Sequence, residues 1–71
     1  MAEEMPEKVK KLFAAFKTAV DSERKAQSMY KDMIAICEDE EIRKVLVGFY
    51  EDEVRHEQEL IRRYNMLREK Q

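Results

Sequence analysis

The chain has 71 residues, of which 42% are charged and 44% hydrophobic, and its formal net charge is -2. Its single cysteine excludes an internal disulfide, and one glycine and one proline leave little to interrupt helices. Basic and acidic residues are interspersed, so no basic patch indicates nucleic-acid binding, and no apolar run approaches the roughly 18 residues of a membrane span.

The first predicted helix spans about residues 7–37. Pro6 and Glu7 are typical of a helix start, because proline at the first helical position loses no hydrogen bond and an acid there favours the positive end of the helix dipole. Apolar residues then recur at spacings of three and four, which indicates one amphipathic face. These residues are Val9, Leu12, Phe13, Phe16, Ala19, Val20, Ala26, Tyr30, Met33, Ile34 and Cys37.

The second predicted helix spans about residues 39–70 and follows the acidic segment CEDEE at 37–41. Asp39 is expected to cap its N-terminus. The main apolar seam of this helix consists of Ile42, Leu46, Phe49, Leu60 and Leu67. Because the connection is short, the two helices should be antiparallel neighbours. The sequence therefore predicts an all-α fold, in which residues 1–71 form a single antiparallel two-helix hairpin.

Two polar residues interrupt the apolar face of the first helix. With Phe16 at heptad position a, eleven of the thirteen a, d and e positions between Val9 and Cys37 are apolar. The exceptions are Glu23 and Gln27, which lie one helical turn apart. Since the register is well determined, both side chains should point inward.

The second helix carries its own inward polar residues. Glu53 and His56 interrupt the main seam three residues apart, and therefore lie on one helical face, with Glu57 beside them. Glu23 and Glu53 each lie fifteen residues from position 38, which is roughly 22 Å from the turn and predicts that they face each other. Glu23, Glu53 and His56 should thus converge near the middle of the hairpin.

An inward carboxylate needs a compensating charge, because an unpaired buried one costs several kcal/mol. Carboxylate oxygen and imidazole nitrogen together suit divalent iron, manganese or zinc. In di-iron and di-manganese four-helix bundles, two helices each supply a glutamate and the other two each supply Glu-x-x-His. This chain carries half of that set. A hairpin of this size is also marginally stable alone, so both arguments predict a homodimer.

Over about residues 9–67 the chain resembles the ferritin-like superfamily, in particular rubrerythrin-type half-bundles and the encapsulated ferritins. The resemblance rests on Glu23 with Tyr30 seven residues later, on the acidic turn at 38–41 and on the motif from Glu53 to His56. It implies a four-helix bundle of two chains with a ferroxidase centre between them. Glu23, Glu53 and His56 would be its catalytic residues and metal ligands, with two iron ions per dimer interface and Tyr30 nearby.

Partners and location follow from the same resemblance. Encapsulated ferritins assemble as rings of dimers inside an encapsulin shell, which implies a homo-oligomer, at least a dimer, and such a shell as a partner. The lone Cys37 fits a reducing compartment, and no apolar leader segment is present near the N-terminus. We therefore expect a cytoplasmic protein, within an encapsulin compartment by resemblance, that binds neither nucleic acid nor membranes.

Together with this resemblance, the ligand set predicts a di-iron carboxylate protein that oxidises Fe(II), and the resemblance implies a ferroxidase-type oxidoreductase for iron storage or detoxification. Alternatives at this point are a rubrerythrin-like peroxide reductase, a site for manganese or structural zinc, and a non-catalytic dimerisation module held by interchain salt bridges. Gln27 and Glu57, with Tyr30, are candidates for residues just outside the ligand set. A further apolar stripe of Val47, Val54 and Ile61 predicts a second interface.

Overall fold

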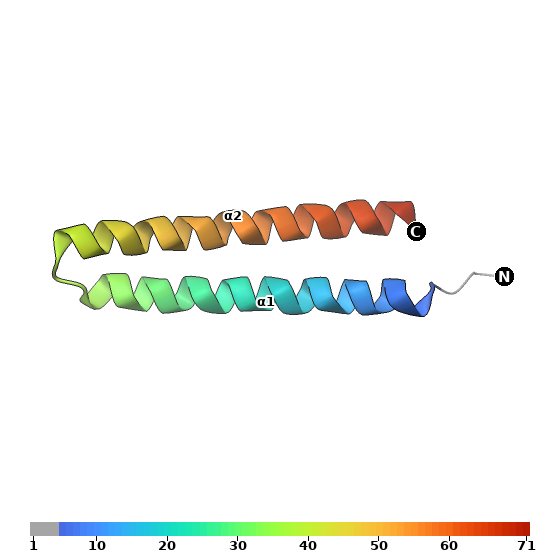
Figure 1. Ribbon diagram of the computed structural model, residues 1–71, viewed down its shortest axis with the longest axis horizontal. Coiled ribbons are helices and arrows are strands. Elements are labelled where there is room, and N and C mark those ends of the chain that lie inside the picture. Colours follow the sequence, from blue (N-terminus) through green and yellow to red (C-terminus); the bar gives the residue numbers. More distant parts are fainter. Residues whose placement is uncertain (1–4) are drawn as a thin grey trace.

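The computed structural model describes residues 5–71, which form two helices, α1 (Glu7–Ile36) and α2 (Glu40–Lys70). The helices lie side by side and run in opposite directions (Figure 1). The predicted all-α helical hairpin is confirmed for this part of the chain. The helix bounds differ by one residue from the expected end at 37 and the expected start at 39. Residues 1–4 of the predicted domain lie outside the described part.

The N-terminus of α2 is capped as the sequence predicts. The Asp39 side chain accepts a hydrogen bond from the backbone N–H of Ile42 at 2.9 Å, which satisfies one of the donors that a helix start leaves free. Glu40 and Glu41 lie in the first turn, where the helix dipole favours acids. Arg43 then donates a hydrogen bond back to the carbonyl of Cys37, so the short connection is tied to α2 at both of its ends.

α1 begins at Glu7 as expected, but Pro6 caps the helix and does not occupy its first position. Pro6 is the N-cap residue, with extended backbone angles, and the helix begins at Glu7. The Pro6 carbonyl accepts hydrogen bonds from the backbone N–H groups of Val9 at 3.0 Å and Lys10 at 3.1 Å. A cap residue accepts the first helical hydrogen bonds without itself adopting helical angles, so proline is tolerated there as well as at the first helical position.

Aromatic contacts hold the two helices together along their shared face. The Tyr64 ring packs edge-on against Phe13 and Phe16, with ring centroids 5.1 and 6.2 Å apart, and Tyr30 packs on Phe49 at 5.7 Å. Yet Leu46 is the only buried residue among residues 5–71. The radius of gyration is 16.7 Å, whereas a compact domain of this length would have about 11 Å. One hairpin therefore lacks a core of its own.

The helices are offset along their axis relative to the sequence prediction. Glu23 lies midway between Phe16 and Tyr30, and these residues pack on Tyr64 and Phe49. On α2, the midpoint between Phe49 and Tyr64 falls between residues 56 and 57. Glu23 is therefore level with His56, and Glu53 lies one turn closer to the connection. The level counted from the turn is thus shifted along the helices, although the carboxylates of Glu23 and Glu53 still approach within 4.8 Å. Residues 37–39 carry the chain past the end of α1 before α2 begins (Figure 1).

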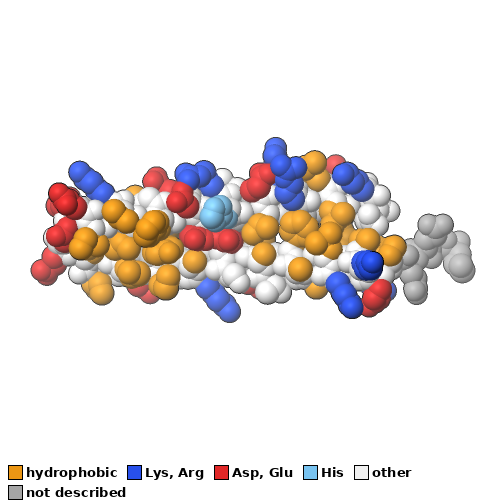
Figure 2. Space-filling view, in the orientation of Figure 1, with side chains coloured by type: hydrophobic (Ala, Val, Ile, Leu, Met, Phe, Trp, Pro, Cys, Tyr) orange, Lys and Arg blue, Asp and Glu red, His pale blue; other side chains and the backbone are white. Residues whose placement is uncertain are grey.

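One side of the hairpin exposes a large apolar surface, here called the open face. It consists of Leu12 and Met33 from α1 and Ile42, Val45 and Phe49 from α2, all between 41% and 55% exposed. Figure 2 shows the histidine and neighbouring acidic side chains between two clusters of hydrophobic side chains on this face. Neither helix within residues 5–71 is long and apolar enough to cross a membrane.

The predicted second stripe lies on another side of α2. In helical projection its members, Val47, Val54 and Ile61, lie roughly 140 to 180 degrees from His56. Val47 and Ile61 are each 37% exposed. The stripe is therefore separate from the open face, as the sequence predicts.

Candidate metal centre

Three potential metal ligands from both helices converge near the middle of the hairpin. Glu23 on α1 and Glu53 and His56 on α2 each offer one ligand atom, and these atoms all lie within 4.8 Å of one another. The i,i+3 spacing of Glu53 and His56 places them on adjacent turns of one face. Because His56 is level with Glu23, its ring reaches across the interface between the helices. The structure thus brings together all three of the predicted site residues.

The distances within this cluster are longer than good hydrogen bonds. The Nδ1 atom of His56 lies 3.5 Å from Oε2 of Glu23 and 3.7 Å from Oε2 of Glu53, whereas an N–H···O hydrogen bond is typically about 2.9 Å long. Ligand atoms that each lie about 2.1 Å from a shared cation are roughly 3 to 4 Å apart, depending on the angle between them. The spacing therefore fits donors around a cation.

The carboxylate of Glu23 lacks the partners that a buried oxygen needs. Its Oε2 atom is buried and has no hydrogen-bond partner among residues 5–71. Such a group is costly to leave unsatisfied. Glu53 is shielded to a similar degree, with side-chain exposures of 21% for Glu53 and 22% for Glu23. The donor chemistry and this unpaired oxygen both fit a divalent cation.

His56 is the exposed member of the cluster. The His56 side chain is 59% exposed and lies on the open face, between the hydrophobic clusters seen in Figure 2. Three ligands leave positions free on a cation that prefers four to six. The unfilled coordination positions of such a cation would face outward from the open face, where a partner molecule could supply further ligands.

Comparison of the chain with protein families, with curated proteins and with solved structures finds no match. The functional argument is therefore carried by the geometry of Glu23, Glu53 and His56.

The residues predicted around the ligands occupy different places. Gln27 donates a hydrogen bond from Nε2 to Oε1 of Glu57 at 2.6 Å and a longer one to the backbone carbonyl of Glu53 at 3.5 Å. These contacts place Gln27 and Glu57 directly beside the cluster. Tyr30 instead packs on Phe49, two turns from Glu23, and no hydrogen bond joins its hydroxyl to the cluster within residues 5–71. Its proposed part at the site stays a prediction.

Arg24 is a neighbour of the site that the sequence reasoning missed. Its Nε atom lies 3.0 Å from Oε2 of Glu57 in an ion pair between the helices. The Gln27 hydrogen bond, followed by Arg24, lowers the pKa of the Glu57 carboxyl below its usual value of 4.5. A signal was available, since Lys10, Lys17, Arg24 and Lys31 recur every seven residues on α1. That row flanks the helix interface, where an arginine can reach an acid on α2.

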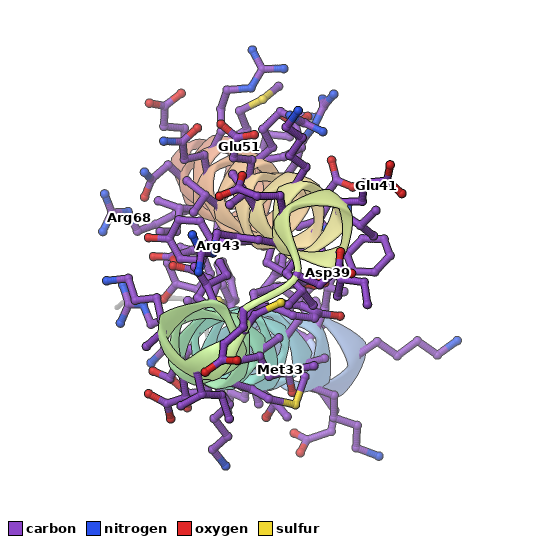
Figure 3. All side chains as sticks on the ribbon, turned by 90° about the vertical axis from the view of Figure 1, so that its left-hand side faces the viewer. Met33, Asp39, Glu41, Arg43, Glu51 and Arg68 are labelled. Carbon is purple, nitrogen blue, oxygen red and sulfur yellow. The ribbon has the colours of Figure 1, made fainter. Side chains whose placement is uncertain are left out.

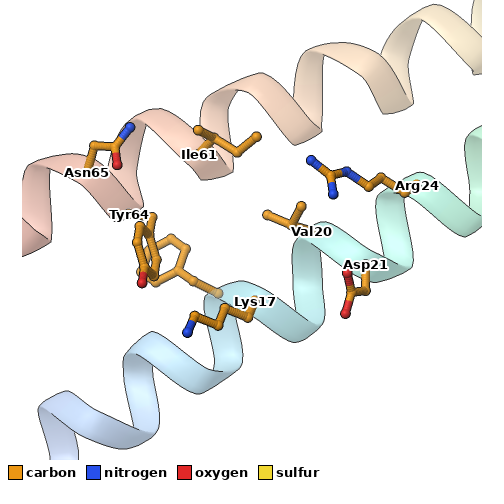
Figure 4. Close-up of a pocket in the computed structure, with 8 residues that line it drawn as sticks. Lys17, Val20, Asp21, Arg24, Ile61, Tyr64 and Asn65 are labelled. Carbon is orange, nitrogen blue, oxygen red and sulfur yellow. The ribbon is translucent and has the colours of Figure 1, made fainter.

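An apolar hollow on the hairpin lies away from the cluster. It is lined by apolar side chains, Phe16 and Val20 from α1 and Ile61 and Tyr64 from α2, with Lys17, Asp21, Arg24 and Asn65 at its rim (Figure 4). None of the three candidate ligands lines it. The hollow and the open face therefore lie on different sides of the helix pair, and Arg24 at the rim of the hollow pairs with Glu57.

Proposed function

We propose that two copies of this chain pair through their open faces into a four-helix bundle, and that the bundle oxidises Fe(II) at a site built from both copies of Glu23, Glu53 and His56. The observation that carries the proposal is the convergence of these ligand atoms within 4.8 Å in the middle of an exposed apolar surface. A second copy of the chain would complete the ligand set and would also cover the exposed apolar residues.

A second, symmetry-related chain would supply the ligands and the apolar contacts that a single chain lacks. Two chains related by a two-fold axis through the cluster would bring four glutamates and two histidines together, which is the donor set of di-iron carboxylate bundles. The same association would cover the apolar residues of the open face, which are Leu12, Met33, Ile42, Val45 and Phe49. Burial of apolar surface at about 25 cal/mol per Å² then favours association. It also excludes water from both sides of the ligands.

The chemistry follows from these ligands. Two Fe(II) ions, as substrate, each lose one electron, and dioxygen takes up the two electrons with two protons from solvent to give hydrogen peroxide. Glu23 and Glu53 would hold the ions close together by neutralising their charge, and they favour the Fe(III) product because hard carboxylate oxygens bind the higher charge more strongly. His56 would add a nitrogen donor from the exposed side.

A second candidate function rests on the same distances. If His56 is protonated, its Nδ1 atom at 3.5 and 3.7 Å from the two glutamates forms ion pairs, and the cluster then fixes the alignment of a non-catalytic helical dimer. This rival requires no metal. It predicts that purified protein contains none and that a chelator leaves the dimer intact.

The test is aerobic addition of Fe(II) at two ions per two chains, followed by the absorbance of Fe(III). The proposal predicts oxidation faster than in buffer and loss of the excess rate in Glu53→Ala protein. Glu51→Ala is the matched control, because Glu51 is also an acid on α2 but is exposed on the side away from α1 (Figure 3). Equal rates in wild type and Glu53→Ala protein would contradict the proposal.

A parallel experiment determines whether dioxygen or hydrogen peroxide is the preferred oxidant. Fe(II)-loaded protein is mixed without oxygen with hydrogen peroxide, which takes two electrons and two protons to give two molecules of water. A ferroxidase should react faster with dioxygen. A rubrerythrin-like peroxide reductase should instead react faster with peroxide, again with loss of rate in Glu53→Ala protein.

A further inference from the structure

A fourth acid lies next to the candidate ligands but does not join them. Glu57 follows His56 in the chain and lies one turn beyond Glu53, and its side chain is only 19% exposed. Side chains four residues apart on a helix have Cβ atoms about 6 Å apart, so a flexible glutamate there is within reach of a cation held by Glu53. Among residues 5–71, however, the group that could hold a metal comprises Glu23, Glu53 and His56 alone.

Both oxygens of Glu57 are engaged by residues of α1. Oε1 accepts a hydrogen bond from Gln27 at 2.6 Å, and Oε2 accepts one from Arg24 at 3.0 Å. A charge-assisted bond of this kind is among the stronger hydrogen bonds of proteins. A carboxylate whose two oxygens are both held in this way must break two contacts before it can bind a metal.

The donors are placed so that they pull Glu57 away from the open face. Arg24 follows Glu23 in the chain and therefore projects about 100 degrees further around α1. Its side chain extends across the space between the helices, on the side of the apolar hollow (Figure 4). His56 lies on the other side, on the open face. Glu57 and the ligands thus face different sides of the helix interface, although they are neighbours along α2.

We infer that Arg24 and Gln27 are positioning residues that hold the Glu57 carboxylate out of the ligand set, and thereby determine which divalent cation the site prefers. The inference rests on the proposed metal site. Carboxylate oxygen suits Mn²⁺, whereas imidazole suits Zn²⁺ and Fe²⁺. With Glu57 restrained, each chain offers two carboxylates and one imidazole. With Glu57 released, the set gains a third carboxylate and shifts toward Mn²⁺.

The experiment measures the affinities of the full chain for Mn²⁺ and Zn²⁺ and takes their ratio. Arg24→Ala should shift the ratio toward Mn²⁺ by roughly tenfold, the size of effect typical of residues that support metal ligands. Gln27→Ala removes the other donor and should shift the ratio in the same direction. Lys17→Ala is the matched control for lost charge, because Lys17 occupies the same position one heptad earlier and makes no contact with Glu57. It should leave the ratio unchanged.

The decisive comparison repeats Arg24→Ala in a Glu57→Gln background. If Arg24 acts by restraining Glu57, the substitution shifts the ratio in the wild-type background and has no effect in the Glu57→Gln background. An equal shift in both backgrounds, or no shift in either, overturns the inference while leaving the metal site intact. Wild-type protein that binds neither ion would instead overturn the proposed function, and the inference with it. Circular dichroism confirms that each variant remains helical.

Discussion

The Nδ1 atom of His56 on α2 lies 3.5 Å from the Oε2 atom of Glu23 on α1, and this oxygen is buried without a hydrogen-bond partner among residues 5–71. Glu53 approaches the same nitrogen at 3.7 Å. Two carboxylates beside one imidazole need either a proton or a cation between them. The two possibilities distinguish the rival dimerisation module, which needs a proton, from the proposed metal centre, which needs a cation.

If the proposed dimer forms through the open face, substitution of an open-face residue should dissociate it. Phe49 is 46% exposed in the single hairpin, and Phe49→Asp would place an unpaired charge in the interface, at a cost of several kcal/mol. We expect the dimer to weaken by at least about a hundredfold in sedimentation equilibrium. Val47→Asp is the control, because Val47 is 37% exposed but lies on the second stripe. Equal dimer affinity in the two variants would show that the open face is not the interface.

Removal of the α2 cap should lower stability. The Asp39 side chain accepts a hydrogen bond from the Ile42 N–H at 2.9 Å, so Asp39→Ala leaves that donor without its partner. The free energy of unfolding should fall by about 1 kcal/mol in urea denaturation. Asp32→Ala, at an exposed position inside α1, should change it by less than about 0.5 kcal/mol. The same loss in both variants would argue against a capping role.

Gly48 provides a test of where the partner chain approaches. It lies inside α2, and a Cβ atom at this position would meet nothing within 4 Å in the single hairpin. Gly48→Ala should therefore raise the free energy of unfolding by about 0.5 to 1 kcal/mol through helix propensity. Thermal unfolding at fixed protein concentration measures it. Destabilisation would mean that a partner backbone packs closely against this residue.

Glu59 should contribute to stability in a pH-dependent way. Arg62 and then Arg63 donate hydrogen bonds to its carboxylate and lower its pKa below the usual 4.5. Because the folded pKa is depressed, this contribution is present above pH 4.5 and is lost as the pH falls through the folded pKa. A carboxyl NMR titration of Glu59 should show a midpoint below 4.5, restored toward 4.5 in Arg62→Ala/Arg63→Ala protein. A midpoint at 4.5 in wild type would contradict the ion pairs.

The hydrophobic period and the turn chemistry made much of the fold predictable. Spacings of three and four in both halves indicate two amphipathic helices, and Asp39 after an acidic turn marks the start of α2. The same register made Glu23 and Glu53 recognisable as inward polar residues, whereas His56, also expected to point inward, is 59% exposed. A residue that breaks a well-determined apolar face is informative because a core tolerates it only with compensation.

The heptad pattern does not predict two features of the structure: the axial offset between the helices and the ion pair between Arg24 and Glu57. The level of Glu23 relative to α2 is set by how far residues 37–39 carry the chain past the end of α1, and counting from the turn missed this offset. The pairing of Arg24 with Glu57 depends on side-chain direction. Arg24 belongs to a row of cations that flanks the helix interface, but the heptad pattern does not show which acid on α2 it reaches.

Native mass spectrometry of the purified protein, combined with elemental analysis, tests the shared metal site most directly. The proposal predicts a species of twice 8.6 kDa that carries two metal ions. A chelator should remove the ions and weaken the dimer, because four uncompensated carboxylates would then repel one another. Glu23→Gln/Glu53→Gln protein should bind no metal. A metal-free dimer that is indifferent to the chelator, or a single chain under the same conditions, would contradict the proposal.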